Sequence, residues 1–204
     1  MPLFYILISG KRCVGKDTVA SMLHREIPDS FVMGFADILK YQYAKRIAPD
    51  QVEECYERLL NDYEFKQKHR MGLIELSQEE KRRYGNDIWV RRLLNYVREV
   101  YGSTEKFVTV IIADTRFRYE LEHPAFVRDN SLKIRVECPD NLREQRGWTF
   151  DSRYDCDESE TDLSLTNSAF DRIVVNDGTL DDLERKCVEI LSHLKFLKSG
   201  DDLD

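Results

Sequence analysis

Residues 6–18 read ILISGKRCVGKDT, an apolar run that ends at Gly10 and continues into a GxxxxGK spacing from Gly10 to Lys16. This spacing is typical of a phosphate-binding P-loop, whose glycine-permitted turns aim backbone N–H groups inward while the next helix directs its positive end at polyphosphate. An ordinary strand-to-helix turn would explain either glycine alone, but not Lys16 after Gly15. The stretch predicts a strand at residues 3–8, a nucleoside triphosphate site and a helix at residues 16–26.

The residue after Lys16 departs from the usual P-loop pattern. Ser or Thr ordinarily stands there and binds Mg²⁺ through its hydroxyl, whereas this chain has Asp17 and a hydroxyl only at Thr18. We expect the whole loop to hold the nucleotide. Its predicted nucleotide-binding residues are Gly10, Lys11, Arg12, Cys13, Val14, Gly15, Lys16, Asp17 and Thr18.

Size and composition indicate a soluble chain. At 204 residues with 42% hydrophobic content, one large domain is expected. The five cysteines show no CxxC spacing and the four histidines form no close pair, which argues against a disulfide framework or a zinc site and favours the cytoplasm. No apolar run reaches membrane-spanning length, and residues 3–8 lack the flanks of a signal peptide. We therefore expect no membrane partner.

The charge of the chain is unevenly distributed. Residues 151–204 hold 15 acidic and 6 basic side chains, whereas residues 1–150 hold 23 acidic and 25 basic ones. An acidic protein with local clusters of arginine suits small anions better than a nucleic-acid backbone. We expect a binder of small anions that binds no nucleic acid, and we expect it to be a monomer.

Strands alternate with helices along the chain, which predicts a P-loop α/β fold with three layers (α/β/α) and a five-stranded parallel sheet. Apolar, β-prone runs place strands at residues 3–8, 30–36, 106–113, 132–137 and 171–176. Helical patterns fall at residues 16–26, 37–49, 51–61, 63–76, 78–83, 88–101, 140–146 and 180–197, with Asp37 as the cap of the second. We expect one domain with its core at residues 1–49, 106–138 and 170–198, a helical insertion at about 50–105 and a lid at about 139–165. The charged residues 151–162 predict a mobile surface loop, and the tail SGDDLD is expected to fray.

Asp114 follows the predicted central strand at residues 106–113 and is open to two interpretations. A carboxylate at the carboxyl end of a strand beside a P-loop lies where a Mg²⁺-organising aspartate is wanted. Alternatively, Asp114 or Thr115 caps a helix that starts near Arg116. Asp17 and Asp114 are the predicted metal residues.

Several motifs together resemble the animal-type phosphomevalonate kinases, which are P-loop kinases similar to nucleoside monophosphate kinases. They are SGKRxxGKD at residues 9–17, LKxQYA at 39–44, DTR at 114–116, RxxRGWxF at 143–150, ESE at 158–160 and VxNxG at 174–178. The matches span nearly the whole chain, and RGWxF followed by ESE is the most specific to the family. The resemblance implies an ATP-dependent, Mg²⁺-assisted kinase that converts phosphomevalonate to diphosphomevalonate, with the helical insertion binding the acceptor.

One departure from the family pattern opens a second hypothesis. Phe117 follows Arg116 where these kinases have another arginine, and DTRFxxE is similar to deoxynucleoside monophosphate kinases of phage type. A third hypothesis, motivated by Asp17 and Phe117, is an ATP-binding regulatory protein without transfer activity. The first two imply a phosphate acceptor, which is already ionised near neutral pH and needs no general base.

Phosphoryl transfer gathers negative charge, so its predicted catalytic residues are cations. They are Lys11, Arg12, Lys16, Arg116, Arg143 and Arg146. Arg116 would grip the acceptor phosphate because its planar guanidinium can form two parallel hydrogen bonds. Lys11 and Arg12 could instead be solvated loop residues. Arg143 and Arg146, three apart on one helix face, would belong to the lid.

The remaining assignments follow the resemblance and each has a structural alternative. Lys40 and Arg135, together with Arg116 and Arg146, are the predicted substrate residues, although Arg135 could form a cross-strand ion pair. Asn176 would read the adenine edge, or else only shape the Asn-Asp-Gly turn. Trp148 would pack the lid hinge or anchor the core.

Overall fold

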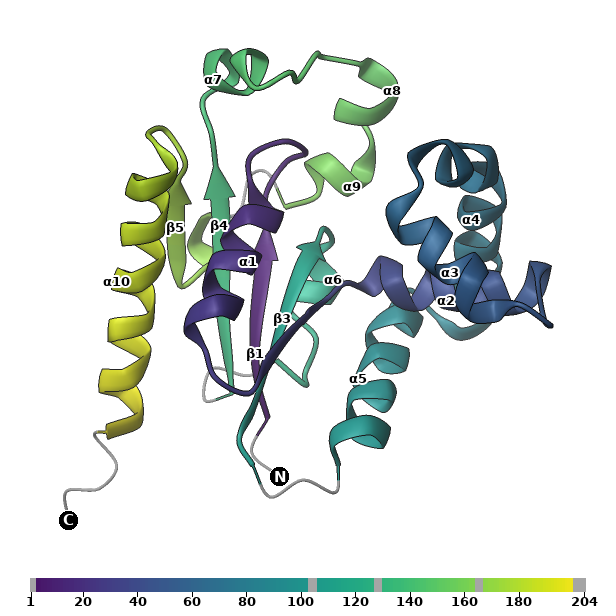
Figure 1. Ribbon diagram of the computed structural model, residues 1–204, viewed down its shortest axis with the longest axis horizontal. Coiled ribbons are helices and arrows are strands. Elements are labelled where there is room, and N and C mark those ends of the chain that lie inside the picture. Colours follow the sequence, from purple (N-terminus) through teal and green to yellow (C-terminus); the bar gives the residue numbers. More distant parts are fainter. Residues whose placement is uncertain (1–2, 103–105, 127–129, 164–166, 200–204) are drawn as a thin grey trace. The chain divides into compact units, whose positions relative to one another are not determined.

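The computed structural model describes residues 3–102, 106–126, 130–163 and 167–199 (Figure 1). The chain forms two compact units, one of Met1–Val32 with Glu105–Asp204 and one of Met33–Thr104. The first carries the sheet and the P-loop, and the second consists mainly of helices. The helical unit starts near residue 33 rather than at residue 50, because α2 (Phe35–Ile47) packs with the helices that follow it. The single domain stays a prediction.

A five-stranded sheet forms the first unit, in the order β2-β3-β1-β4-β5. The strands are β1 (Leu3–Ser9), β2 (Ser30–Met33), β3 (Val108–Thr115), β4 (Ser131–Glu137) and β5 (Arg172–Val175). The central β1 pairs in parallel with β3 and β4, and β4 pairs in parallel with β5. Parallel strands bring all their carboxyl ends to one edge, where ligands of open α/β sheets gather. The predicted P-loop α/β fold is confirmed.

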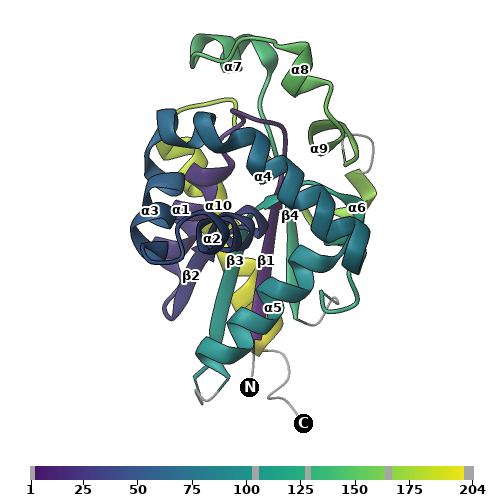
Figure 2. The same ribbon diagram turned by 90° about the vertical axis from the view of Figure 1, so that its right-hand side faces the viewer.

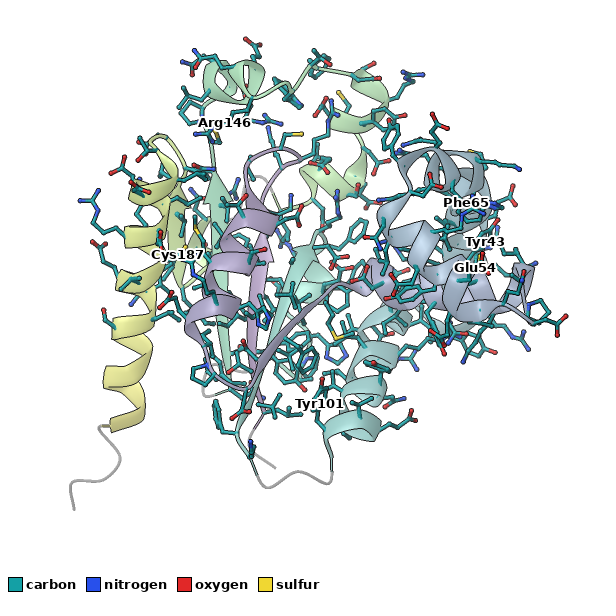
Figure 3. The ribbon with its side chains drawn as sticks, in the orientation of Figure 1. Tyr43, Glu54, Phe65, Tyr101, Arg146 and Cys187 are labelled. Carbon is teal, nitrogen blue, oxygen red and sulfur yellow. The ribbon has the colours of Figure 1, made fainter. Side chains whose placement is uncertain are left out.

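Two helices cover one face of this sheet, α1 (Lys16–Glu26) and α10 (Leu180–Ser199) (Figure 1). The apolar spacing of α1 puts Val19 and Leu23 on its buried stripe, and Cys187 of α10 points at the sheet (Figure 3). On the other face, the ring of Phe126 meets Tyr5 edge-on at 5.0 Å between centroids. This core holds β1 and the start of α1 in place, and thereby the P-loop between them.

The segments that follow β3 and β4 carry four short helices, of which the last three lie near the carboxyl ends of β1 and β4 (Figures 1 and 2). They are α6 (Arg118–Leu121), α7 (Asp140–Gln145), α8 (Ser152–Asp155) and α9 (Glu158–Thr161), and a 3-10 turn, η1 (Asn167–Ala169), precedes β5. We call residues 139–163 the lid segment. This segment lies at the same end of the sheet as the P-loop.

The second unit is built from α2, α3 (Val52–Asn61), α4 (Tyr63–Tyr84) and α5 (Ile88–Tyr101). Buried apolar side chains from three of the helices form its own small core; they are Tyr43, Ala44, Cys55, Leu59, Leu73 and Leu76. Tyr43 and Phe65 are among the residues marked in Figure 3. In the part of the chain that the structure describes, no helix combines the length and apolar character needed to cross a membrane.

Five local predictions differ from the structure. The helices expected at residues 63–76 and 78–83 are one helix, α4, because the Ser77 hydroxyl accepts a hydrogen bond from Trp89 Nε1 at 3.1 Å instead of competing for the helix backbone. The second strand stops at Met33, and Gly34 rather than Asp37 is the N-cap of α2. The Asp37 carboxylate reaches back to the Gly34 N–H at 2.8 Å.

The other two differences concern the predicted site. β3 continues through Asp114 and Thr115, so the interpretation of either as a helix cap is wrong; Phe117 is the N-cap of α6. The predicted loop at residues 151–162 contains α8 and α9, since Asp151 and Asp157 cap these two turns. Residues 200–204 of the tail lie outside the described part of the chain.

Candidate active site

The P-loop makes its turns with glycines that no larger residue could replace. Gly10 has φ +146°, and a Cβ there would lie 2.3 Å from the Val136 carbonyl oxygen. Gly15 has φ +98° and a Cβ there would lie 2.5 Å from Nδ2 of Asn176. Gly15 is the N-cap of α1 and has no side chain to cap the helix, so the first amides of α1 remain directed at the loop interior.

Lys16 folds back over this loop. Its Nζ donates hydrogen bonds to the carbonyl oxygens of Gly10 at 2.7 Å and of Lys11 at 2.8 Å. The side chain is buried, and burial lowers the pKa of Lys16 to about 8, with Arg116 acting in the same direction. The ammonium group is therefore fixed at the mouth of the loop by two backbone carbonyl oxygens.

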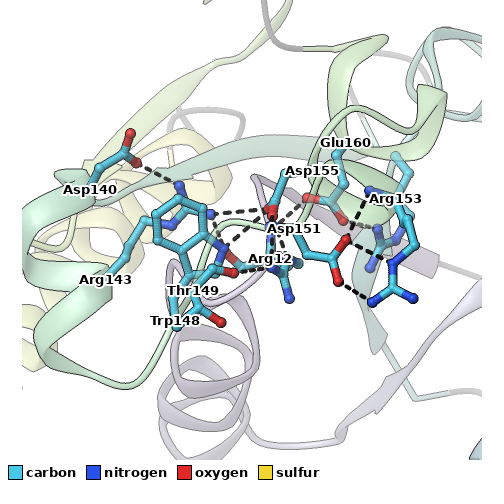
Figure 4. Close-up of polar contacts among 10 residues, drawn as sticks. Arg12, Asp140, Arg143, Trp148, Thr149, Asp151, Arg153, Asp155 and Glu160 are labelled. Carbon is cyan, nitrogen blue, oxygen red and sulfur yellow. Dashed lines mark hydrogen bonds and ion pairs between the residues drawn. The ribbon is translucent and has the colours of Figure 1, made fainter.

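Arg12 ties the loop to the lid segment (Figure 4). Its guanidinium donates from Nε to Oδ1 and from Nη2 to Oδ2 of Asp155, both at 2.7 Å. The guanidinium also lies 5.9 Å from the ring of Trp148 and 5.6 Å from that of Tyr154. Planar cations stack well on aromatic faces, so the fork and the rings fix the Arg12 side chain in one orientation.

Arg143 is packed beneath the same tryptophan. Its guanidinium carbon lies 3.8 Å from the Trp148 ring centroid, and its nitrogens donate to the Arg12 carbonyl at 2.9 Å and to Asp140 at 2.6 Å. Only 2% of Arg143 is exposed. The sequence predicts that Trp148 packs either the lid hinge or the core. In the structure its ring contacts the guanidinium groups of Arg12 and Arg143, so it packs within the lid segment and against the P-loop.

Glu160 of α9 joins two of the predicted phosphate-binding residues. Its Oε2 accepts a hydrogen bond from the backbone N–H of Arg12 at 2.6 Å, and its Oε1 pairs with the Arg116 guanidinium. The Glu160 side chain is 5% exposed. A P-loop amide and the arginine at the end of β3 thus converge on one anionic group.

A pocket of about 540 Å³ opens between the P-loop and the turn that follows β5. Asn176 lines it, but its side-chain amide donates to the Val14 carbonyl at 2.9 Å and supports the loop. Arg146 reaches the same pocket and donates to the carbonyl oxygens of Asn176 at 3.3 Å and Gly178 at 3.1 Å (Figure 3). Although they are three residues apart, Arg143 and Arg146 therefore contact different parts of the site.

A second pocket, of about 350 Å³, lies on the β4 side of the loop and is lined by Lys11, Arg135 and Arg143 among others. Arg135 forms an ion pair at 2.9 Å with Glu137, two residues on along the same strand, and donates to the Leu163 carbonyl at 2.8 Å. The ion pair therefore lies within one strand and does not cross strands. Lys11 is exposed at the rim.

The candidate Mg²⁺ residues lie around Lys16. The negative charges of Asp17 and Asp114, like that of Glu160, oppose the fall in the pKa of Lys16. Among the described residues no cluster of three or more His, Cys, Asp or Glu side chains could hold a metal by itself. Mg²⁺ usually takes one or two carboxylates and completes its shell with water and substrate phosphates, so this oxygen-donor set fits that metal in the presence of a nucleotide.

Lys40 lies on α2, in the helical unit. Its Nζ lies 2.8 Å from Oδ1 of Asp37, and Oδ2 of the same aspartate accepts the Gly34 N–H. The lysine has a structural partner in its own helix. Its predicted role toward the acceptor stays a prediction.

Two site residues lie outside the sequence-based set, Asp155 and Glu160. The motif ESE contained Glu160 without giving it a role, and Asp155 carried no local signal at all. The surplus of acidic residues after residue 150 was the only hint that this segment would pair with basic residues of the loop.

Known proteins resemble this chain in sequence and in fold. A model of the phosphomevalonate kinase family matches residues 8–127. A phosphomevalonate kinase of Drosophila melanogaster is 26% identical over 190 residues, which cover 91% of this chain and 93% of the relative.

Two solved structures share the fold. TT1252 from Thermus thermophilus superimposes with a TM-score of 0.57 at 16% identity, over 95% of this chain and 99% of that one. Dephospho-CoA kinase from Campylobacter jejuni gives a TM-score of 0.50 at 13% identity, over 94% and 97% of the two chains. At such identities these similarities concern the fold alone.

Proposed function

We propose that this chain, which belongs to the phosphomevalonate kinase family, transfers the γ-phosphate of ATP to phosphomevalonate and forms diphosphomevalonate. The observation that carries the proposal is the convergence of the Arg12 N–H and the Arg116 guanidinium on one carboxylate, that of Glu160. One donor comes from the nucleotide loop and the other from the end of β3. Such a pair suits a phosphoryl group that passes between a donor and an acceptor.

The P-loop would hold ATP. Its inward amides and Lys16 would bind the terminal phosphates, and the pocket between the loop and the β5 turn has the size of a small-molecule site. Arg146 borders that pocket, so we assign it to the nucleotide side. Asp17 and Asp114 would organise Mg²⁺, which supplies positive charge that the phosphates need during transfer.

Arg116 would contact the acceptor side of the transferred group. Lys40 and Arg135 would add positive charge toward the phosphate of the acceptor, as the family resemblance suggests. The attacking atom is an oxygen of a phosphate monoester, which carries negative charge at neutral pH. The chemistry is therefore positioning and charge neutralisation, and no side chain has to remove a proton.

One observation favours a second acceptor class. Phe117 and Tyr119 stack with their rings 5.1 Å apart and an interplanar angle of 10°. A flat aromatic pair beside Arg116 could face a nucleobase, which would suit a deoxynucleoside monophosphate kinase. The family match favours phosphomevalonate over this alternative.

A coupled assay of ADP release decides between these activities. Phosphomevalonate and a panel of nucleoside monophosphates are each offered with ATP and Mg²⁺, and unphosphorylated mevalonate serves as the acceptor control. We expect turnover with phosphomevalonate only. The Lys16→Ala variant should lose transfer to every acceptor. Turnover with nucleoside monophosphates alone would support the second acceptor class, and a chain that binds ATP but transfers to none would be a regulatory protein.

We further propose that the protein acts as a monomer in the cytoplasm and binds no nucleic acid. All five cysteines, which lie in the described part of the chain, are free thiols, as expected in a reducing compartment. Light scattering at micromolar concentration would test the monomer. A mass of twice 24.1 kDa would contradict it.

A further inference from the structure

We propose that the Glu160 carboxylate is an internal ligand of the subsite that receives the phosphoryl group in transfer, and that the γ-phosphate of ATP must displace it. The inference rests on the phosphoryl-transfer function proposed above. It assigns to the lid segment an anion that competes with the nucleotide.

The contacts of Glu160 are those that a bound phosphate would make. Its two oxygens are used separately, Oε2 by the backbone N–H of Arg12 at 2.6 Å and Oε1 by the Arg116 guanidinium. Backbone amides of a P-loop and an arginine fork are both standard phosphate donors. A carboxylate presents two negatively charged oxygens to them, as one edge of a phosphate does.

Charge explains why an internal anion belongs there. The Arg116 guanidinium and the Arg12 N–H both meet the Glu160 carboxylate, whose side chain is only 5% exposed, and the buried Lys16 ammonium belongs to the same loop. Without an anion between them, the Arg12 N–H and the Arg116 guanidinium would lose the acceptor that both use. Glu160 neutralises the subsite until a phosphate takes its place.

Glu160 lies on a single helical turn, α9, which is capped by Asp157. The residues after the turn hold the chain in place, since the Asp162 carboxylate accepts the Arg118 N–H at 2.6 Å and Leu163 is buried. Glu160 therefore leaves by a movement of its side chain, and the cost is mainly the loss of its two charge-assisted hydrogen bonds. The neighbouring Asp155 can stay on Arg12 and keep the lid segment attached to the loop while Glu160 moves.

Competition of this kind has a measurable consequence. The apparent dissociation constant of a ligand rises by the reciprocal of the fraction of protein in which its subsite is free. A ligand with a γ-phosphate is subject to this penalty, whereas ADP, which does not reach the subsite, is not. The ratio of the affinity for the γ-phosphate ligand to the affinity for ADP therefore measures how often the Glu160 carboxylate occupies the subsite.

The test compares Glu160→Gln with wild type in titration calorimetry, using ADP and a non-hydrolysable imido analogue of ATP. The glutamine keeps the size and shape of the side chain and removes its charge. We expect the analogue to bind tighter by on the order of tenfold, given the strength of a charged hydrogen bond, and ADP to bind as before. Glu158→Gln is the matched control, because Glu158 lies on the same turn, carries the same charge and is exposed. It should change neither affinity.

Unchanged or weaker binding of the analogue to Glu160→Gln would overturn the proposal, as would equal tightening of both ligands. A lower kcat with unchanged affinities would make Glu160 a positioning residue for Arg116 and would also overturn it. Turnover with phosphomevalonate is measured separately on the wild type. If the ATP analogue binds Glu160→Gln more tightly but the wild type shows no turnover with phosphomevalonate, Glu160 is the internal ligand and the proposed acceptor is refuted. If the wild type turns over phosphomevalonate but the ratio of the two affinities is unchanged in Glu160→Gln, the proposed function holds and the internal ligand is refuted.

Discussion

Arg12 and Asp155 form a two-bond fork, from Nε to Oδ1 and from Nη2 to Oδ2, that joins the P-loop to a residue 143 positions later in the chain. The side chains are 28% and 8% exposed, so solvent screens the pair only in part. The hydrogen bonds from Arg12 hold the pKa of the Asp155 carboxyl well below its usual range. The fork makes the lid segment a stable neighbour of the nucleotide loop.

Asp155→Asn should destabilise the protein. The substitution keeps the shape of the side chain but removes the charge that two hydrogen bonds of Arg12 depend on, and we expect the free energy of unfolding to fall by about 1–2 kcal/mol. Urea denaturation at pH 7 measures it. Glu144→Gln is the control, since Glu144 is an exposed lid carboxylate and should cost almost nothing. Equal losses in the two variants would show that the fork is not the cause.

The stability gap between wild type and Asp155→Asn should depend on pH. The folded protein holds the Asp155 carboxyl at a lower pKa than the unfolded chain, where the value is about 3.9. The stabilisation is therefore fully present above the unfolded pKa and is lost as the pH falls through the folded one. The gap should stay constant from about pH 5 to 7 and shrink below about pH 4. A gap that widens on acidification would contradict this account of the fork.

Binding of ATP should draw a proton onto Lys16. Burial lowers its pKa to about 8 in the free protein, and the phosphates would raise it again by their negative charge. At pH 8 we expect an uptake of roughly half a proton per ATP, falling toward zero from this residue at pH 6.5. Calorimetry in two buffers with different ionisation enthalpies measures the uptake. A binding enthalpy at pH 8 that is independent of the buffer would show that the ammonium is already fully protonated.

The fold was readable from the sequence where periodicity and chemistry agreed. The helices at Lys16–Glu26 and Ile88–Tyr101 match their predicted ranges, because an apolar stripe of period 3.6 coincides with a clear start or stop. The predicted break near residue 77 is wrong, because α4 runs through it. The Ser77 hydroxyl bonds to Trp89 of another helix instead of to its own backbone. A long-range hydrogen bond of this kind has no local sequence signal.

The site was readable only in part, for the same reason. The cations Arg12, Arg116 and Arg143 could be selected by motif, yet their partners lie on the lid segment, at sequence separations of up to 143 residues. Composition marked residues 151–162 as a charged loop and could not show that Asp155 and Glu160 face the P-loop. Charged residues with partners look the same in sequence as solvated ones.

Asn176→Asp should weaken the binding of ATP and GTP alike. The amide of Asn176 donates to the Val14 carbonyl at 2.9 Å, and a carboxylate would set two acceptors against each other at the base of the P-loop. We expect the affinity for both nucleotides to fall on the order of tenfold or more, because the buried hydrogen bond to the Val14 carbonyl is replaced by repulsion between two oxygens. Asp177→Asn, at the exposed neighbouring position, is the control. A change in the preference between ATP and GTP would instead support the role of Asn176 in reading the adenine edge.

Arg116→Ala should remove transfer while leaving the nucleotide loop intact. The guanidinium pairs with Glu160 at the point where the phosphoryl group would pass, and loss of one transition-state arginine costs on the order of a thousandfold in kcat. Arg116→Lys should recover only part of the rate, because an ammonium keeps the charge and loses the fork. Steady-state kinetics with phosphomevalonate measure the rate, and titration with ADP should give an affinity within about twofold of wild type, since Lys16 is untouched. Arg172→Ala, an exposed arginine of β5, is the control. Unchanged kinetics in Arg116→Ala would remove this residue from the reaction, and a parallel loss of ADP affinity would mean that it supports the loop instead.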